Sequence, residues 1–325
     1  MEVELTQLPT PPPFGLVSNV GCFYDSETMT RPRTGYVLFF LGLLTLRVFG
    51  AEPATGIGGH HSLWKVQGPH STVYLLGSVH VLKESDYPLP PVIESAFSNA
   101  TVAVFETEID AMDQPATQMR MMSKSRLPEG VTLEQELSAK TYQMLQAHAE
   151  TAGVPMVVLS GIKPVLAVMT LEVLEFQKLG LDPKYGLDQH FFKLARAAGK
   201  EVVPLETVDF QLDLITGFSK EESEMLVKAT LEDIDNTRKS LAEMLNAWRT
   251  GDGDKLEKLL NEVRDEAPVI FKRLVTDRSQ SWVPKIMELA KGDKPAIVIV
   301  GAGHLVGASG LIDLLRKQGL KVSQE

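Results

Sequence analysis

Two segments far apart in the chain share one design, and this repetition constrains the fold more than any other feature. Residues 72–80 (Thr-Val-Tyr-Leu-Leu-Gly-Ser-Val-His) and residues 296–304 (Ala-Ile-Val-Ile-Val-Gly-Ala-Gly-His) each run as an apolar segment to a glycine, and a histidine follows three residues later. Short apolar runs that end at glycine are typical of strands buried inside a sheet. The repetition predicts two related halves that contribute strands to one central sheet.

A third apolar run, residues 101–105, ends on Glu106. The carboxyl ends of parallel strands meet at one edge of a sheet, so we expect His80, Glu106 and His304 to converge there. Two imidazoles and a carboxylate are the groups that a metal-assisted or histidine-driven hydrolytic site needs. Imidazole nitrogens bind Mn, Co, Zn or Fe, and the carboxylate would complete a three-ligand site.

Three other charged residues are candidates for the same site. Glu108 lies two residues after Glu106, so on a strand both side chains would point to one face, and Glu108 could act as a base. Arg278 could bind an oxyanion or a substrate carboxylate. Each also has an ordinary explanation, a solvated strand end for Glu108 and a surface salt bridge for Arg278. Asp188 is interpreted most simply as the cap of the helix that it begins.

The overall pattern predicts an α/β (α+β) fold with a mixed central sheet, two related halves and a long helical insertion. A hairpin is expected from residue 63 to 76, and residues 207–290 are almost entirely helical in pattern. Residues 110–130 are rich in Met and Ser and lack clear periodicity. The remaining strands are expected over residues 202–205, 296–300 and 320–323.

The N-terminal region has the pattern of an export signal. An apolar stretch at 36–46 follows Arg31 and Arg33 and precedes the small-residue segment 48–51. It is shorter than the roughly 18 apolar residues of a membrane span. We therefore expect 1–28 to be an extension before the true start at Met29, 29–51 a signal peptide, 52–62 a linker and 63–325 the catalytic domain. The product would be periplasmic or secreted without a stable membrane span, or membrane-anchored if the signal is not cleaved.

Composition excludes several classes of function. The 325 residues carry a net charge of −10, which argues against a nucleic-acid partner. The single cysteine, Cys22, lies in the upstream extension, so the mature chain is expected to have no disulfide or thiol chemistry. Gly301, Gly303 and Gly307 imitate a dinucleotide fingerprint, but their spacing is wrong and too little chain follows for a nucleotide-binding unit.

At these residues the chain resembles the TraB/GumN family, which includes the Tiki metalloproteases. The resemblance extends over about residues 63–323. The matching pieces are residues 76–80, 105–108, 163–164, 186–188 and 205–207, then Gln211, Arg278, Trp282 and residues 301–307. The resemblance implies that His80, Glu106 and His304 bind a divalent metal and that peptide bonds are the substrate. Serine stands at position 279, where many relatives have asparagine.

We expect an exported metal-dependent hydrolase, most simply a metallopeptidase that uses Mn, Co or Zn and acts on a peptide or protein. The metal would activate a water, Glu108 would take its proton, and Arg278 would hold the oxyanion or a substrate carboxylate. Two alternatives stay open. One is a metal-free esterase in which a histidine activates water directly. The other is a haem- or ligand-binding protein that uses the same histidines as axial ligands.

Overall fold

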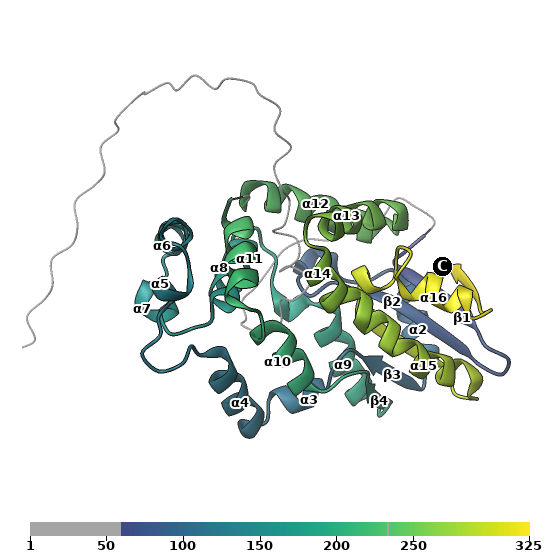
Figure 1. Cartoon of the computed structure of the whole chain (residues 1–325). Helices are drawn as coiled ribbons and strands as arrows, with labels where there is room; N and C mark the ends of the chain where they lie inside the picture. The colour runs from purple at the N-terminus through teal and green to yellow at the C-terminus, as the bar shows by residue number, and fades with distance from the viewer. Residues whose placement is uncertain (1–59, 233) are drawn as a thin grey trace, which may run out of the picture. The chain divides into compact units, whose positions relative to one another are not determined.

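The computed structural model describes residues 60–232 and 234–325, with the side chains of 234–239 left aside (Figure 1). The predicted extension, the predicted signal peptide and residues 52–59 of the predicted linker lie outside the described residues. The described part is built around one six-stranded sheet with the strand order β4-β3-β5-β2-β1-β6. The strands are β1 (Leu63–Gln67), β2 (Thr72–Ser78), β3 (Val102–Phe105), β4 (Glu201–Pro204), β5 (Ala296–Gly301) and β6 (Lys321–Gln324).

The sheet is mixed, as the sequence predicts. Strands β4, β3, β5 and β2 run parallel to one another, with β5 between β3 and β2. The hairpin partner β1 is antiparallel to β2, and β6 is antiparallel to β1. The two repeated segments are thus direct neighbours, because β2 and β5 pair from Val73↔Ala296 to Ser78↔Gly301. The carboxyl ends of all four parallel strands therefore meet at one edge.

The centre of the sheet is the apolar core. All residues of β3 and β5 are buried, in keeping with strands that are covered on both faces. Burying one Val, Leu or Ile side chain stabilises the fold by about 1.5–3 kcal/mol, so these two short strands provide much of the driving force for the sheet. Helix α9 packs against β3 and β4, and α15 packs against β2.

Helices make up most of the remaining chain, and the two long runs of helix lie between β3 and β4 and between β4 and β5 (Figure 1). Their bounds are α2 (Pro91–Asn99), α3 (Ile109–Met112), α4 (Pro115–Ser125), α5 (Leu133–Glu136), α6 (Ala139–Ala152), α7 (Met156–Leu159), α8 (Pro164–Lys178), α9 (Leu187–Ala197), α10 (Val208–Thr216), α11 (Lys220–Glu232), α12 (Ile234–Thr250), α13 (Gly253–Glu266), α14 (Pro268–Phe271), α15 (Asp277–Lys291) and α16 (Leu311–Lys317). Short helical turns are η1 (Glu84–Asp86), η2 (Pro183–Tyr185), η3 (Lys272–Thr276) and η4 (Ala302–His304).

Residues 110–130, whose sequence lacks clear periodicity, contain most of α3 and all of α4. In α4 only Thr117 is buried, so the helix has no apolar stripe to be seen in the sequence. The helix instead packs on α10, where Lys124 pairs with Asp213 at 2.6 Å. The contacts of α4 with α10, about 90 residues further along the chain, hold the helix in place, and such contacts leave no periodic pattern in the sequence.

The last residues of the predicted linker belong to the folded domain. Ser62 is buried, its hydroxyl donates to the carbonyl of Trp248 at 3.0 Å, and its own carbonyl accepts from the Gly77 N–H at 2.7 Å. No helix within residues 60–232 and 234–325 combines the length and the apolar character needed to cross a membrane.

Candidate active site

The carboxyl ends of the four parallel strands bring four polar side chains to one edge of the sheet. His80 follows β2, Glu106 follows β3, Glu206 follows β4, and His304 lies on the turn η4 after β5. The backbone N–H of Glu206 donates to the carbonyl of Glu106 at 2.8 Å, which extends the pairing of β3 and β4 to these two residues. A charge on His80 contributes to lowering the pKa of His304. The four parallel strands thus carry these residues to one edge of the sheet, where Glu106, Glu206 and His304 all contact Arg278.

His80 is oriented by Asp188, at the start of α9. The Nδ1 atom of His80 lies 2.8 Å from Oδ2 of Asp188, and the hydroxyl of Ser78 donates to the same oxygen at 2.5 Å. Because an ionised carboxylate only accepts, Nδ1 of His80 carries a proton. No hydrogen bond to Nε2 of His80 is found among the described residues, and the side chain is 13% exposed. Asp188 thus binds His80, and the helix cap that the sequence suggested for it does not form.

The environment of His80 favours its protonated form. Burial on its own would lower the pKa of His80, but the adjacent Asp188 carboxylate and the nearby Glu106 raise it to about 9. The loop that carries His80 is held against α9 by the N–H of Leu187, which donates to the carbonyl of Val79 at 3.1 Å. A side chain at Gly186 would lie 2.5 Å from the carbonyl oxygen of His80, so this close approach requires glycine.

The side chains of His80, Asp188, Glu106, Glu206, Gln211, Arg278 and His304 form a polar cluster at this edge. Arg278 is buried and contacts both glutamates and His304. Its Nε and Nη2 atoms donate to Glu206 at 2.9–3.1 Å, and Nη2 also donates to Oε2 of Glu106 at 2.6 Å. Its Nη1 atom donates to the carbonyl of Leu274 at 3.2 Å and to Nε2 of His304 at 3.1 Å. A guanidinium has five N–H groups. These contacts use all of them, which leaves none for the substrate oxyanion or carboxylate that the sequence led us to expect.

A local irregularity of the helix places Arg278. The turn η3 is a π-helix, a form that is rare and frequent at functional sites, and it leads directly into α15. Further along α15 the indole N–H of Trp282 donates to Oε1 of Glu206 at 3.0 Å, and the Arg278 guanidinium lies 4.9 Å from the Trp282 ring. Glu206 thereby fixes both the arginine and the tryptophan.

His304 is neutral, and its proton can be assigned. Since Nη1 of Arg278 can only donate, Nε2 of His304 must accept, and the proton of the neutral ring is on Nδ1. Nδ1 lies 2.9 Å from the hydroxyl of Ser279. Burial and the Arg278 charge lower the pKa of His304 to about 3. His304 therefore has no free nitrogen with which to take a proton from water.

Glu106 is ionised although it is buried. Burial would raise the pKa of Glu106, but Arg278 and the two histidines lower it to about 2, together with a hydrogen bond from the N–H of Gly301 to Oε1 at 2.7 Å. Gln211, on α10, bridges the two glutamates through Nε2, at 3.3 Å from Glu106 and 3.2 Å from Glu206. The Oε1 atom of Gln211 and the hydroxyl of Thr107 are buried without a hydrogen-bond partner among the described residues.

The structure places Glu108 apart from the other predicted residues. Strand β3 ends at Phe105, and Glu108 is the exposed residue that begins α3. The alternation expected of a continuous strand therefore stops before it reaches Glu108. No hydrogen bond joins its side chain to the cluster in the described part of the chain.

Sequence reasoning missed the roles of Asp188, Glu206, Gln211 and Ser279. One signal for Glu206 was available, because it follows an apolar strand in the same way as Glu106. The other three residues lie on helices, where nothing in the spacing points to the site.

The predicted metal ligands do not fit a metal in this arrangement. Binding by His80, Glu106 and His304 would require a lone pair from each, but Nε2 of His304 is occupied by the Arg278 guanidinium, which also binds Glu106. Within the described ranges, no three His, Cys, Asp or Glu side chains are arranged to hold a metal ion. The divalent metal stays a prediction. The same contact blocks His304 as an axial ligand of haem.

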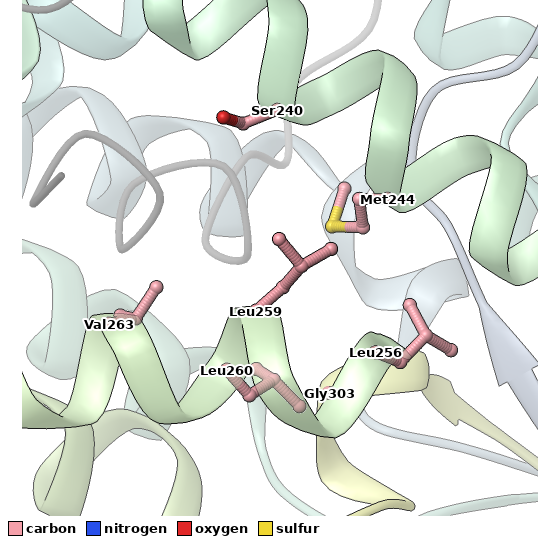
Figure 2. A pocket seen from close by; sticks show the side chains of 7 residues that line it. All are labelled: Ser240, Met244, Leu256, Leu259, Leu260, Val263 and Gly303. Atoms are coloured by element: carbon pink, nitrogen blue, oxygen red, sulfur yellow. The ribbon is translucent and has the colours of Figure 1, made fainter. Parts of the chain in front are cut away.

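An apolar pocket reaches the turn η4 at Gly303 (Figure 2). Its lining comes mostly from α12 and α13 and consists of Ser240, Met244, Leu256, Leu259, Leu260, Val263 and Gly303. Among these residues only Ser240 offers a polar side chain, so the wall of the pocket is apolar and provides no reactive group.

The comparison with protein families decides the affiliation of the chain. The model of the TraB/PrgY/gumN family matches residues 62–324, which contain every residue of the cluster. The chain belongs to the TraB/PrgY/gumN family. This confirms the family resemblance that the motifs suggested.

Two relatives of this TraB/PrgY/gumN chain are similar to it over most of its length. YbaP of Escherichia coli (strain K12), described as an uncharacterized protein, is 25% identical over 243 residues, which cover 75% of this chain and 87% of YbaP. An uncharacterized protein of Treponema pallidum (strain Nichols) is 21% identical over 296 residues, which cover 87% of this chain and 89% of that protein. No solved structure matches the chain.

Proposed function

We propose that the chain is a hydrolase in which His80 activates the attacking water. One observation carries this proposal. Of the imidazole nitrogens in the cluster, Nε2 of His80 is the one that has no protein partner among the described residues while its ring is held in place through Nδ1 by Asp188. A ring fixed in this way by a carboxylate, with the opposite nitrogen open, is the arrangement of a general base.

The proposed reaction uses the neutral form of His80, which is the minor form at neutral pH because its pKa is about 9, so the rate should rise with pH up to about 9. Nε2 takes a proton from a water, and the oxygen of that water bonds to the carbonyl carbon of the substrate. The bond between this carbon and the leaving nitrogen then breaks, and the proton on Nε2 passes to the departing amine. Asp188 stabilises the imidazolium that exists between the two proton transfers. Glu108, which was expected to be the base, takes no part.

We propose peptide bonds as the substrate because the motifs of this chain resemble those of the Tiki proteases. We further propose that the protein is exported, on the basis of the basic and apolar pattern at residues 31–51. An ester substrate would be cleaved by the same steps with an alcohol as the leaving group.

A metal-dependent peptidase is the second candidate, and the charge of the cluster favours it. Glu106 and Glu206 both bind the one guanidinium, and Asp188 adds a third carboxylate beside His80, so a bound cation would meet a negative environment. His80, Glu106 and His304 would be its ligands if Arg278 moved away.

One set of assays separates these possibilities. Hydrolysis of a peptide library and of simple aryl esters would be measured for the wild type with and without a chelator. The same assays would be run on His80→Ala, Asp188→Asn, Glu108→Gln and, as a control, His70→Ala, which alters an exposed turn. We expect loss with His80→Ala, a fall of about 10²–10⁴-fold with Asp188→Asn, and wild-type rates for the last two.

Each contrary outcome has a distinct meaning. Full activity of His80→Ala would overturn the proposed base. Loss on chelation, restored by Mn, Co or Zn, would favour the metal-dependent candidate. A large loss with Glu108→Gln would return the role of base to Glu108.

A further inference from the structure

The cluster already contains a cation, and its ligands are of the kind that divalent metals use. Arg278 donates to one oxygen of Glu106 at 2.6 Å, to one oxygen of Glu206 at 2.9 Å and to the imidazole Nε2 of His304 at 3.1 Å. Two carboxylates and one imidazole are a common ligand set for Zn, Mn and related ions. The guanidinium is thus bound by acceptors that could equally bind a metal.

We propose that Arg278 occupies the place of a divalent cation. The guanidinium and a metal compete for Glu106, Glu206 and His304, so the wild-type chain excludes a metal and loss of the guanidinium creates a metal site. This proposal rests on the proposed function in one respect: hydrolysis by His80 without a metal requires that Arg278 keeps metals out of the site.

The size of the guanidinium explains why these acceptors do not form a metal site as they stand. Their partners are two nitrogens of a planar group, Nη2 for both glutamates and Nη1 for His304, at hydrogen-bond distances of 2.6–3.1 Å, whereas metal–ligand bonds are about 2.0–2.2 Å to a single point. The acceptors are therefore held too far apart for an ion, in agreement with the lack of a metal-binding group among residues 60–232 and 234–325. Without the guanidinium, the negative charges of the two glutamates would draw a cation between them.

Because Arg278, Glu106 and Glu206 are buried together, the glutamates cannot bind the guanidinium and a metal at the same time. The side chain of Arg278 is 5% exposed, and those of Glu106 and Glu206 are 10% and 6% exposed. Each buried charge needs a partner, because leaving one unpaired strongly destabilises the fold. A metal that entered while Arg278 remained would strand the guanidinium, and Arg278 would have to leave for the metal to bind.

The experiment measures metal uptake and does not depend on hydrolysis. Because His60 and His61 are adjacent and could hold Zn adventitiously, all proteins would carry His60→Ala and His61→Ala and no histidine tag. The otherwise wild-type chain, Arg278→Ala and Arg278→Ala/Glu206→Gln would be incubated with Mn²⁺, Co²⁺ or Zn²⁺, freed of excess ion, and analysed for bound metal. We expect no stoichiometric metal in the first, about one equivalent in Arg278→Ala, and a fall in affinity of at least about tenfold in the double variant.

Folding of the variants would be checked by circular dichroism, and Arg278→Gln provides a neutral polar replacement if Arg278→Ala does not fold. One equivalent of metal in the protein that retains Arg278 would overturn the proposal, and this arm needs no variant at Arg278. A folded Arg278→Ala or Arg278→Gln that binds no metal would also overturn it. Failure of the proposed hydrolase would appear in the peptide and ester assays and would leave the metal measurements unchanged.

Discussion

Arg278 donates from Nη1 to Nε2 of His304 over 3.1 Å, and this contact gives the two repeated histidines opposite electrostatic properties. His304 faces a guanidinium, and burial together with that charge lowers its pKa to about 3. His80 faces a carboxylate, and despite burial Asp188 raises its pKa to about 9. Two segments of the same design thus end in one neutral and one protonated imidazole at neutral pH. Of these two rings, only that of His80 has a nitrogen, Nε2, without a hydrogen-bond partner among the described residues.

The first prediction concerns the ionisation of His80. Asp188→Asn removes the main group that raises the pKa of His80, so we expect this pKa to fall from about 9, because burial and Arg278 lower it and only Glu106 then raises it. An NMR titration of the histidine ring signals would measure it, with the exposed His70 as an internal reference. A titration of His80 that is the same in both proteins would contradict the assigned role of Asp188.

The same pair makes stability depend on pH. The pKa of His80 is raised in the folded protein, so its contribution is present in full below about 6.5 and is lost as the pH rises through about 9. In Asp188→Asn this loss should be absent. Urea unfolding at about pH 6 and about pH 9.5 would compare the two proteins on either side of this range. If the free energy of unfolding changed equally between the two pH values in both proteins, the His80–Asp188 pair would not be the source of the pH dependence.

The second prediction concerns Glu206, the main partner of Arg278. Glu206→Ala leaves the buried guanidinium without three of its hydrogen bonds, and we expect a loss of about 3–5 kcal/mol in the free energy of unfolding. Glu201→Ala on the preceding strand is the matched control. Its partner Lys294 is 68% exposed, so this pair should contribute less than about 1 kcal/mol. Similar losses in the two variants would show that Glu206 is not needed to hold Arg278.

The third prediction tests the support of His80. Gly186→Ala places a methyl group 2.5 Å from the carbonyl oxygen of His80, so the loop must move at a cost of about 1–3 kcal/mol. We expect the NMR shifts of His80 to change and hydrolysis to fall by about tenfold or more, since a displacement near 1 Å can cost about 10²-fold. Gly161→Ala is the control, because nothing lies within 4 Å of its added methyl group. Wild-type stability and activity of Gly186→Ala would show that the His80 loop can move away from residue 186 without cost.

The fourth prediction concerns a buried carboxyl on a helix that carries none of the cluster residues. Glu172 on α8 is 3% exposed, its Oε1 has no partner among the described residues, and burial raises its pKa well above the usual range. Because the pKa is raised in the folded state, the fold loses stability as the pH rises above about 4.5. The loss is about 1.4 kcal/mol per pH unit until the pH reaches the pKa of the folded state.

Glu172→Gln removes this loss, so we expect the variant to be more stable than the wild type at about pH 7 and to lose that advantage below about pH 4. Thermal unfolding at both pH values would measure the difference. An advantage that is the same at the two pH values would show that ionisation of Glu172 is not its cause.

The sheet and part of the site could be predicted because their signals are local. Apolar strands that stop at glycine show both where β2 and β5 lie and which residues follow them, so His80, Glu106 and His304 could be found by counting along the chain. Glu108 was misplaced by the same counting. The alternation of side chains holds only while the strand continues, and β3 ends at Phe105.

The sequence by itself determined the mixed sheet, the two matched Gly-x-x-His segments and the strand ends that carry the polar residues, since the apolar runs and the glycines that end them are local features of the chain. Only the tertiary structure decided what each polar residue does. Arg278 comes from a helix after a π-turn, Asp188 from another helix, and the charge that each brings sets the ionisation of the histidine beside it. Electrostatic interactions act through space between segments that are distant in the chain, so nothing in the local pattern around a histidine reveals the charge that it will face.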